Sequence, residues 1–148
     1  MASLAAELSE RWYELGSALR SRRLLASLHA GGVAELTPTK LRALDVLARR
    51  GGLRVGELAE RMGVDETSAT RLADRLQAAG LVERRRAPED RRVAIVVLTL
   101  HGQELAEAAA EQRRRFFADV LAALEPGERK ELVRLTAKAA EALQAIAR

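Results

Sequence analysis

The stretch Gly56–Arg85, GELAERMGVDETSATRLADRLQAAGLVERR, contains the local signals that decide the fold. Gly63 breaks the helical pattern of GELAERM, and Asp65 is a good N-cap for a second helix. Gly80 ends that helix in the left-handed position that glycine commonly takes. The stretch therefore predicts two short helices joined by a tight turn. The apolar positions of the second helix fall on one stripe: Ala69, Leu72, Ala73 and Leu76.

Two β-prone runs follow the second helix, over residues 81–85 and 93–98. The polar segment Arg86–Asp90 separates them and is too long for a two-residue turn, so we predict a hairpin with a longer loop. The hairpin concentrates positive charge, because five arginines lie within nine residues: Arg84, Arg85, Arg86, Arg91 and Arg92.

A further helix is predicted on the N-terminal side of this segment. Thr37 is a good N-cap, and Pro38 occupies the first helical position, where its missing N–H costs nothing. Gly51-Gly52 ends the helix, and residues 53–55 are expected to be extended. Leu36 and Leu41 are spaced as a hydrophobic staple across the start of the helix.

The two ends of the chain are also predicted to be helical. Apolar residues recur at three- and four-residue spacing through the first 30 residues, including Leu24, Leu25 and Leu28, as far as Gly31-Gly32. Thr99 caps a long helix over residues 100 to about 124, and Glu125-Pro126 starts the last one. Neither terminal helix has enough neighbours in one chain to bury its apolar stripe, which favours a dimer.

The order helix, turn, capped helix and hairpin is that of a winged helix-turn-helix. We therefore predict a mainly α (α+β) fold in three parts. Residues 36–99 form the DNA-binding lobe, with a recognition helix at 66–79 and a wing at 81–98. Residues 1–35 and residues 100–148 form a helical dimerisation region.

The polar residues of the lobe have the chemistry for double-stranded DNA. Hydroxyls near the start of the recognition helix allow close approach to base edges, and arginines one turn apart reach guanine or phosphate. Arginines of a wing suit the narrow, negative minor groove, and a loop carboxylate can hold one of them in place. The candidate DNA-binding residues are Thr67, Ser68, Thr70, Arg71, Arg75, Arg86, Asp90, Arg91 and Arg92.

Structural explanations exist for several of these arginines. Arg84 and Arg86 can belong to a solvated strand face, and Arg84 can also have a structural role. Arg71 and Arg75 can form salt bridges on the helix surface. We favour DNA contact for Arg71, Arg75, Arg86, Arg91 and Arg92, and leave both readings open for Arg84.

Composition excludes several other classes of protein. The 148 residues carry a net charge of +4 and no cysteine, which excludes disulfides and thiolate zinc sites. No run approaches the roughly 18 apolar residues of a membrane span, and no secretory signal is recognisable, so we expect a soluble, cytoplasmic protein. His29 and His101 lie too far apart in the sequence to suggest a metal site. No catalytic or cofactor motif is present, so neither an enzyme nor a cofactor is expected.

From about Leu36 to Leu105 the chain resembles the MarR (multiple antibiotic resistance regulator) family of transcription factors. The resemblance rests on LTPTKLRALDVL, GELAERMGVDETSATRLADRLQAAGLVERR and APEDRRVAIVVLTLHGQEL. It implies a homodimeric winged-helix repressor or activator, often released from DNA by a small anionic or phenolic ligand. It also implies that Arg92 enters the minor groove, that Asp90 orients it, and that residues 67–75 read the major groove. Family ligand pockets adjoin the dimerisation helices, which makes Arg11, Trp12 and Tyr13 candidate ligand-binding residues.

The sequence thus predicts a homodimeric, sequence-specific regulator of transcription that binds a pseudo-palindromic operator, as a repressor released by a small ligand. The alternative is a winged-helix module whose basic surface binds an acidic protein. Positive charge on the second helix as well as on the hairpin favours DNA, because a protein partner needs no groove geometry.

Overall fold

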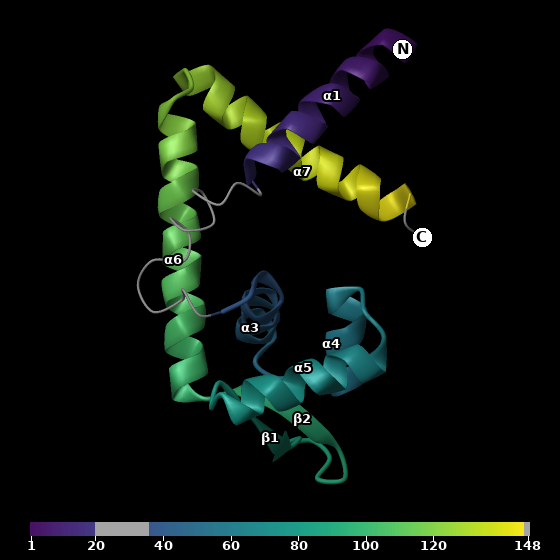
Figure 1. The fold of residues 1–148 in the computed structure, drawn as a ribbon, viewed down its shortest axis with the longest axis vertical. Helices are drawn as coiled ribbons and strands as arrows, with labels where there is room; N and C mark the ends of the chain where they lie inside the picture. Colours follow the sequence, from purple (N-terminus) through teal and green to yellow (C-terminus); the bar gives the residue numbers. More distant parts are fainter. Residues whose placement is uncertain (20–35, 147–148) are drawn as a thin grey trace. The chain divides into compact units, whose positions relative to one another are not determined.

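The computed structural model describes residues 1–19 and 36–146. The chain divides into two compact units, residues 1–112 and 113–148. Figure 1 shows the helices and strands of the chain with their labels. Within the described residues, no helix is both long and apolar enough to cross a membrane. The elements are α1 (Ala2–Leu19), α3 (Pro38–Arg50), α4 (Val55–Met62), α5 (Glu66–Ala78), β1 (Val82–Arg86), β2 (Ala94–Leu98), α6 (Leu100–Ala122) and α7 (Pro126–Ile146).

The predicted starts of α3 and α5 are confirmed by their N-caps. The Thr37 side chain accepts a hydrogen bond from the Lys40 amide, and the Asp65 side chain accepts one from the Ser68 amide. Three glycines adopt positive φ, which L-residues with side chains rarely adopt. Gly51 ends α3, Gly63 ends α4, and Gly80 lies in the turn that follows α5.

Several boundaries differ from the expectation by one residue, and α5 ends at Ala78 rather than at residue 79. The strands cover 82–86 and 94–98 rather than 81–85 and 93–98. Residues 53–55 are not extended throughout, because Val55 already begins α4 and Arg54 is its N-cap. The expectations for Leu24, Leu25, Leu28, His29 and Gly31-Gly32 lie outside the described residues.

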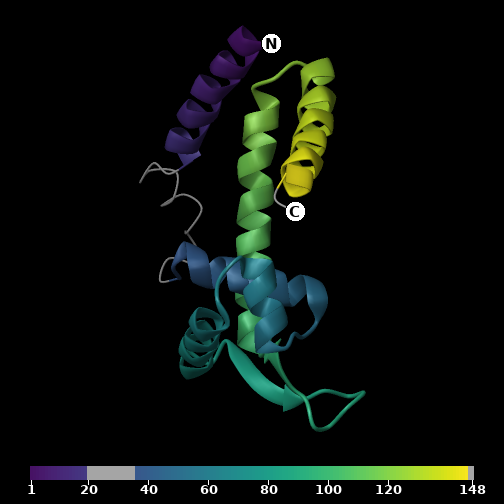
Figure 2. The ribbon, with the colours of Figure 1, turned by 90° about the vertical axis from the view of Figure 1, so that its right-hand side faces the viewer.

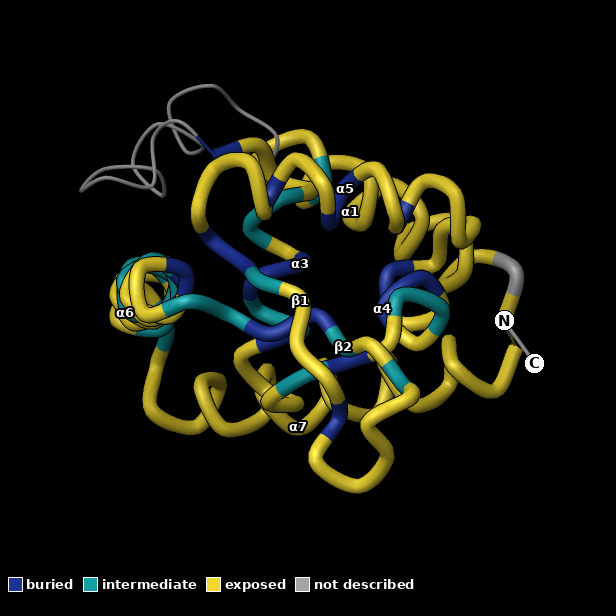
Figure 3. Tube along the Cα trace, turned by 90° about the horizontal axis from the view of Figure 1, so that it is seen from below, coloured by how far each residue is buried: buried dark blue, intermediate teal, exposed yellow. Residues whose placement is uncertain are grey.

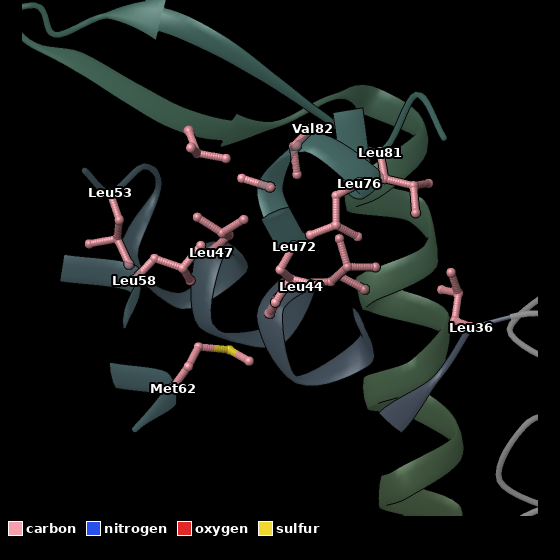
Figure 4. Packing of buried hydrophobic residues seen from close by; sticks show 14 residues of the cluster. Leu36, Leu44, Leu47, Leu53, Leu58, Met62, Leu72, Leu76, Leu81 and Val82 are labelled. Carbon is pink, nitrogen blue, oxygen red and sulfur yellow. The ribbon is translucent and has the colours of Figure 1, made fainter. Parts of the chain in front are cut away.

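The core of the lobe is built from leucines, a methionine and valines of α3, α4, α5 and the hairpin (Figure 4). Figure 3 shows that the outer faces of these helices and the loop of the hairpin are exposed. The start of α6 joins the same core through Ala106. Since each fully buried leucine stabilises the fold by about 1.5–3 kcal/mol, this cluster holds the recognition helix rigidly in place. Its most buried large side chains are Leu44, Leu47, Leu58, Leu76, Val82 and Val96.

The hairpin is an antiparallel pair in which Val82 lies opposite Leu98 and Arg86 opposite Ala94. An isolated bridge between Leu53 and Val96 adds a third short segment to its base. Figure 2 shows the loop of the hairpin extending away from the helices of the lobe. Side chains alternate between the faces of a strand, so Arg84 lies on the same face as the buried Val82.

Candidate nucleic-acid interface

The helix α5 is anchored by one buried face and leaves the other free for a partner. Ala69 and Leu76 are fully buried, whereas Thr67, Thr70 and Arg71 are exposed. The N-terminus of α5 offers backbone N–H groups and the positive end of the helix dipole, both of which favour phosphate. The structure thus presents the predicted contact residues on one solvent-facing side of α5.

Two of the three predicted hydroxyls already have partners in α5 or at its N-cap. The Ser68 hydroxyl donates to the Asp65 carboxylate at 2.6 Å, and the Thr70 hydroxyl donates to the Glu66 carbonyl at 2.9 Å. The bonds from the Ser68 hydroxyl and amide lower the pKa of Asp65 below its ordinary value. Ser68 therefore has a role in the N-cap, the structural alternative to DNA contact for a residue so near the cap, and its hydroxyl is not free to donate to DNA in this arrangement.

The arginines of α5 and the hairpin, apart from Arg86, fall into two groups. Arg84 and Arg85 are paired with carboxylates of the protein. The second group has four arginines, all with exposed side chains. Their guanidinium groups form no hydrogen bond or ion pair with any of the described residues. A guanidinium without a protein partner keeps all five donors for phosphate and base edges. This second group consists of Arg71, Arg75, Arg91 and Arg92.

The loop of the hairpin is held by its own backbone and by Asp90. The Asp90 carboxylate accepts a hydrogen bond from the Arg92 amide at 2.9 Å, and the Val93 amide donates to the Asp90 carbonyl at 3.0 Å. The Arg86 guanidinium donates to the Arg92 carbonyl at 3.4 Å. Asp90 therefore fixes the backbone at Arg92, as an Asx turn does, and leaves the guanidinium of Arg92 without a partner among the described residues.

Arg84 is the residue for which the sequence left both readings open. Its guanidinium donates to the Asp74 carboxylate at 2.6 Å and to the Gln77 side-chain oxygen at 2.5 Å, so it joins β1 to α5. The alternation of side chains along a strand could have indicated this structural role from the sequence, because it places Arg84 on the same face of β1 as the buried Val82. Asp74 pairs with Arg84, and the surface salt bridges considered for Arg71 and Arg75 are absent from the described contacts.

The remaining candidates lie on other helices. In α1, Arg11 pairs with Glu14 at 2.9 Å, while Trp12 and Tyr13 are exposed. In α6, the His101 ring lies 3.9 Å from a Glu104 oxygen. No cluster of three or more potential metal ligands occurs in the ranges 1–19 and 36–146.

A shallow cavity of about 240 Å³ lies beside the exposed face of α5. Its walls come from the start of α3, the end of α4 and the turn before α5, and two of the unpaired arginines line it. Such a mixture of apolar and cationic groups suits a small anion with an apolar body. The lining residues are Thr39, Met62, Val64, Ser68, Arg71, Leu72 and Arg75.

A capped helix exposing arginines beside an arginine-bearing hairpin defines a winged helix-turn-helix DNA-binding protein. Comparison with known proteins identifies the family. The model of the MarR family matches residues 34–93. The transcriptional repressor MdtR of Bacillus subtilis is 36% identical over 121 residues, which cover 82% of this chain and 76% of MdtR. The chain therefore belongs to the MarR family, whose members are DNA-binding regulators of transcription and not enzymes.

Two further relatives agree with this assignment. The uncharacterised regulator YdgJ of Bacillus subtilis is 30% identical over 103 residues, and the match covers 70% of this chain but only 63% of YdgJ. The structure of a MarR family protein from Bacillus stearothermophilus matches this one with a TM-score of 0.84 and 28% sequence identity. The match covers 97% of this chain and 98% of that one. The predicted family and the predicted fold class are both confirmed.

Proposed function

We propose that this protein is a homodimeric, sequence-specific repressor of transcription that leaves its pseudo-palindromic operator when a small anionic or phenolic ligand binds. One observation carries the DNA-binding surface: the unpaired arginines lie on both α5 and the hairpin, outside the packed core. A winged helix-turn-helix uses these two elements to reach adjacent grooves. Repression is the mode favoured by the likeness to MdtR, which is named a repressor.

In this proposal α5 and the hairpin contact different grooves of the DNA. Thr67 and Arg71 of α5 read the major groove, together with Arg75. Arg91 and Arg92 enter the neighbouring minor groove, whose negative potential attracts guanidinium groups. Arg86 lies nearer the base of the loop and contacts phosphate, while Asp90 sets the backbone from which Arg92 extends.

The terminal helices supply the dimer interface in this proposal, as parts of the segments 1–35 and 100–148. None of the residues of α7 is buried in the single chain, and the apolar stripe of α1 is exposed as well. Exposed apolar faces of this size are covered by a partner in stable proteins, and a second copy is the symmetric solution. The large apolar side chains concerned are Leu4, Leu8, Trp12, Leu15, Leu132, Val133, Leu135, Leu143 and Ile146.

The cavity beside α5 is the first candidate for the ligand site. An anionic ligand there would neutralise Arg71 and Arg75, the same groups that DNA needs, so ligand and operator would compete. The alternative is a site at Arg11, Trp12 and Tyr13 of α1, near the proposed dimer interface. Substituting Arg75 and, separately, Trp12 distinguishes the two sites, because only the substitution at the true site abolishes release by the ligand.

A fluorescence-anisotropy titration against DNA from the protein's own upstream region tests the proposal. We expect salt-dependent binding and a footprint of two half-sites about 10 bp apart, centre to centre. Aromatic carboxylates serve as probe ligands, and at least one of a graded series should raise the apparent Kd. Binding to an acidic protein with no preference among DNA sequences would support the protein-interaction module instead.

A further inference from the structure

We infer that Arg84 is a positioning residue: by bridging Asp74 and Gln77, it sets the wing at a fixed distance from the recognition helix and does not itself bind DNA. The inference rests on the proposed use of α5 and the wing as one DNA-binding surface. It assigns Arg84 a different role from Arg86, Arg91 and Arg92 of the same basic run, which are proposed to contact DNA.

The geometry singles out Arg84 within the hairpin. Its guanidinium reaches two side chains of α5 that are three positions apart, at 2.6 Å and 2.5 Å. Two nitrogens on two acceptors define a direction as well as a distance, which a single contact does not. Among the described residues, the side chain of Arg85, the next residue, pairs with Glu83 on its own strand and does not connect β1 to another element.

The place of Arg84 along β1 gives the bridge its mechanical effect. Val82, two residues before Arg84 on β1, is buried in the core and fixes the base of the hairpin. Beyond Arg84, the described polar contacts of Arg86 and Asp90 are made within the hairpin itself. Arg84 is thus the outermost residue of β1 with a described side-chain bond to α5, and the loop extends freely from that point.

Charge gives the bridge a second consequence. Asp74 lies three residues after Arg71 and directly before Arg75, on the exposed side of α5. An unpaired carboxylate there would repel phosphate. Pairing with Arg84 offsets that charge, whereas an ion pair whose side chains are 36% and 57% exposed contributes little to folding stability. The main effect of the pair is therefore on the geometry and the charge of the DNA-binding surface.

A double-mutant cycle on operator affinity tests the inference. We expect Arg84→Ala and Asp74→Ala each to weaken operator binding about tenfold, as for coupled residues in contact, and the double variant to be no weaker than either. The matched control is Arg85→Ala, which removes the same charge from the adjacent position and should weaken binding less. The exchange Asp74→Arg with Arg84→Asp should recover part of the loss, and Arg84→Lys, which cannot bridge both acceptors, should be intermediate.

The salt dependence separates positioning from phosphate contact. A positioning residue leaves the slope of log K against log salt unchanged, whereas loss of a phosphate contact lowers it by about one. If Arg84→Ala lowers the slope and Asp74→Ala binds DNA more tightly than wild type, then Arg84 contacts the backbone and the inference is wrong. Additive effects in the cycle would overturn it as well.

A measurement without DNA keeps this inference distinct from the proposed function. Because the chain has no cysteine, Glu89→Cys provides a single spin-label site in the exposed loop. We expect Arg84→Ala to increase the mobility of that label while Arg85→Ala leaves it unchanged, with thermal melting confirming that both variants fold. Equal mobility in all three proteins would refute the bridge even if operator binding is intact. Failure of the wild type to bind any operator would instead refute the proposed function.

Discussion

Gly102 of α6 lies directly against the backbone of Leu81, so closely that a Cβ at residue 102 would be 1.9 Å from the Leu81 carbonyl oxygen. Two hydrogen bonds fasten the same junction. The Thr99 hydroxyl donates to the Gly80 carbonyl at 2.6 Å and accepts from the Gly102 amide at 3.1 Å. The start of α6 is thereby joined to the turn that follows the recognition helix, and only glycine permits this approach.

The first prediction concerns that junction. Gly102→Ala should destabilise the protein by about 1–3 kcal/mol, because the new methyl group meets backbone that cannot move without disturbing the core. Chemical denaturation measures the loss. Gly127→Ala is the control, since a Cβ there meets nothing within 4 Å, and it should be neutral or slightly stabilising. Equal loss in both variants would show that helix propensity, not the contact with Leu81, governs the result.

The second prediction uses the N-cap of the recognition helix. The bonds from Ser68 lower the pKa of Asp65 in the folded protein below the ordinary value of 3.8. The carboxylate therefore stabilises the fold above that ordinary value, and the contribution is lost as pH falls through the lowered pKa. We expect the Tm difference between wild type and Asp65→Ala to be constant near neutral pH and to shrink below about pH 4. Asp65→Asn, which keeps a capping oxygen but does not titrate, should differ less from wild type at neutral pH, and its Tm should exceed that of Asp65→Ala by an amount nearly independent of pH.

The third prediction concerns Asp90 in the wing. Removing a carboxylate from a DNA-binding loop would improve binding if only charge mattered. Because Asp90 orders the backbone at Arg92, we expect Asp90→Ala to weaken operator binding by about 0.5–1.5 kcal/mol, the typical cost of ordering such a group on binding. Glu89→Ala removes the same charge one residue earlier, where the structure describes no side-chain contact, and should not weaken binding. Tighter binding by Asp90→Ala at every salt concentration would contradict the ordering role.

The fourth prediction separates two arginines of the wing. Arg92→Ala should weaken binding to the operator by about 1–3 kcal/mol and affect unrelated DNA much less, because a groove contact depends on sequence. Arg86→Ala should weaken binding to all sequences similarly and lower the salt slope by about one. Anisotropy titrations of both variants on operator and random DNA measure this. If Arg92→Ala instead weakens binding to all DNA sequences equally, then Arg92 contacts the phosphate backbone of the DNA and not a groove.

The fifth prediction concerns assembly. A dimer should show about twice the 16.2 kDa mass of one chain in sedimentation equilibrium. Deleting residues 126–148 removes α7, whose residues are all unburied in the single chain, and should abolish dimerisation and operator binding. The substitution Leu135→Glu is a milder test, because it places a charge on the apolar stripe without shortening the chain. A wild-type protein that remains a monomer at micromolar concentration would exclude the dimer.

The sequence by itself determined the elements of this protein, because their boundaries depend on neighbouring residues. Thr37 and Asp65 cap their helices through amides three positions away, and Gly51, Gly63 and Gly80 adopt the positive φ that a side chain would make costly. The spacing of apolar residues along α5 likewise predicted which face is buried. The same local patterns placed the basic residues on a helix and a hairpin, which was enough to predict a winged helix-turn-helix and to propose its DNA-binding surface.

Only the tertiary structure decided what each basic residue is free to do. Arg84 and Arg92 are chemically identical and lie in one charge run, yet Arg84 is bound to Asp74, ten positions earlier, while Arg92 has no side-chain partner among the described residues. The distance between α5 and β1 depends on how the core packs, and so does the fit of Gly102 against Leu81. Neither relationship follows from local spacing, because it joins residues whose separation in space is set by the leucines and valines between them.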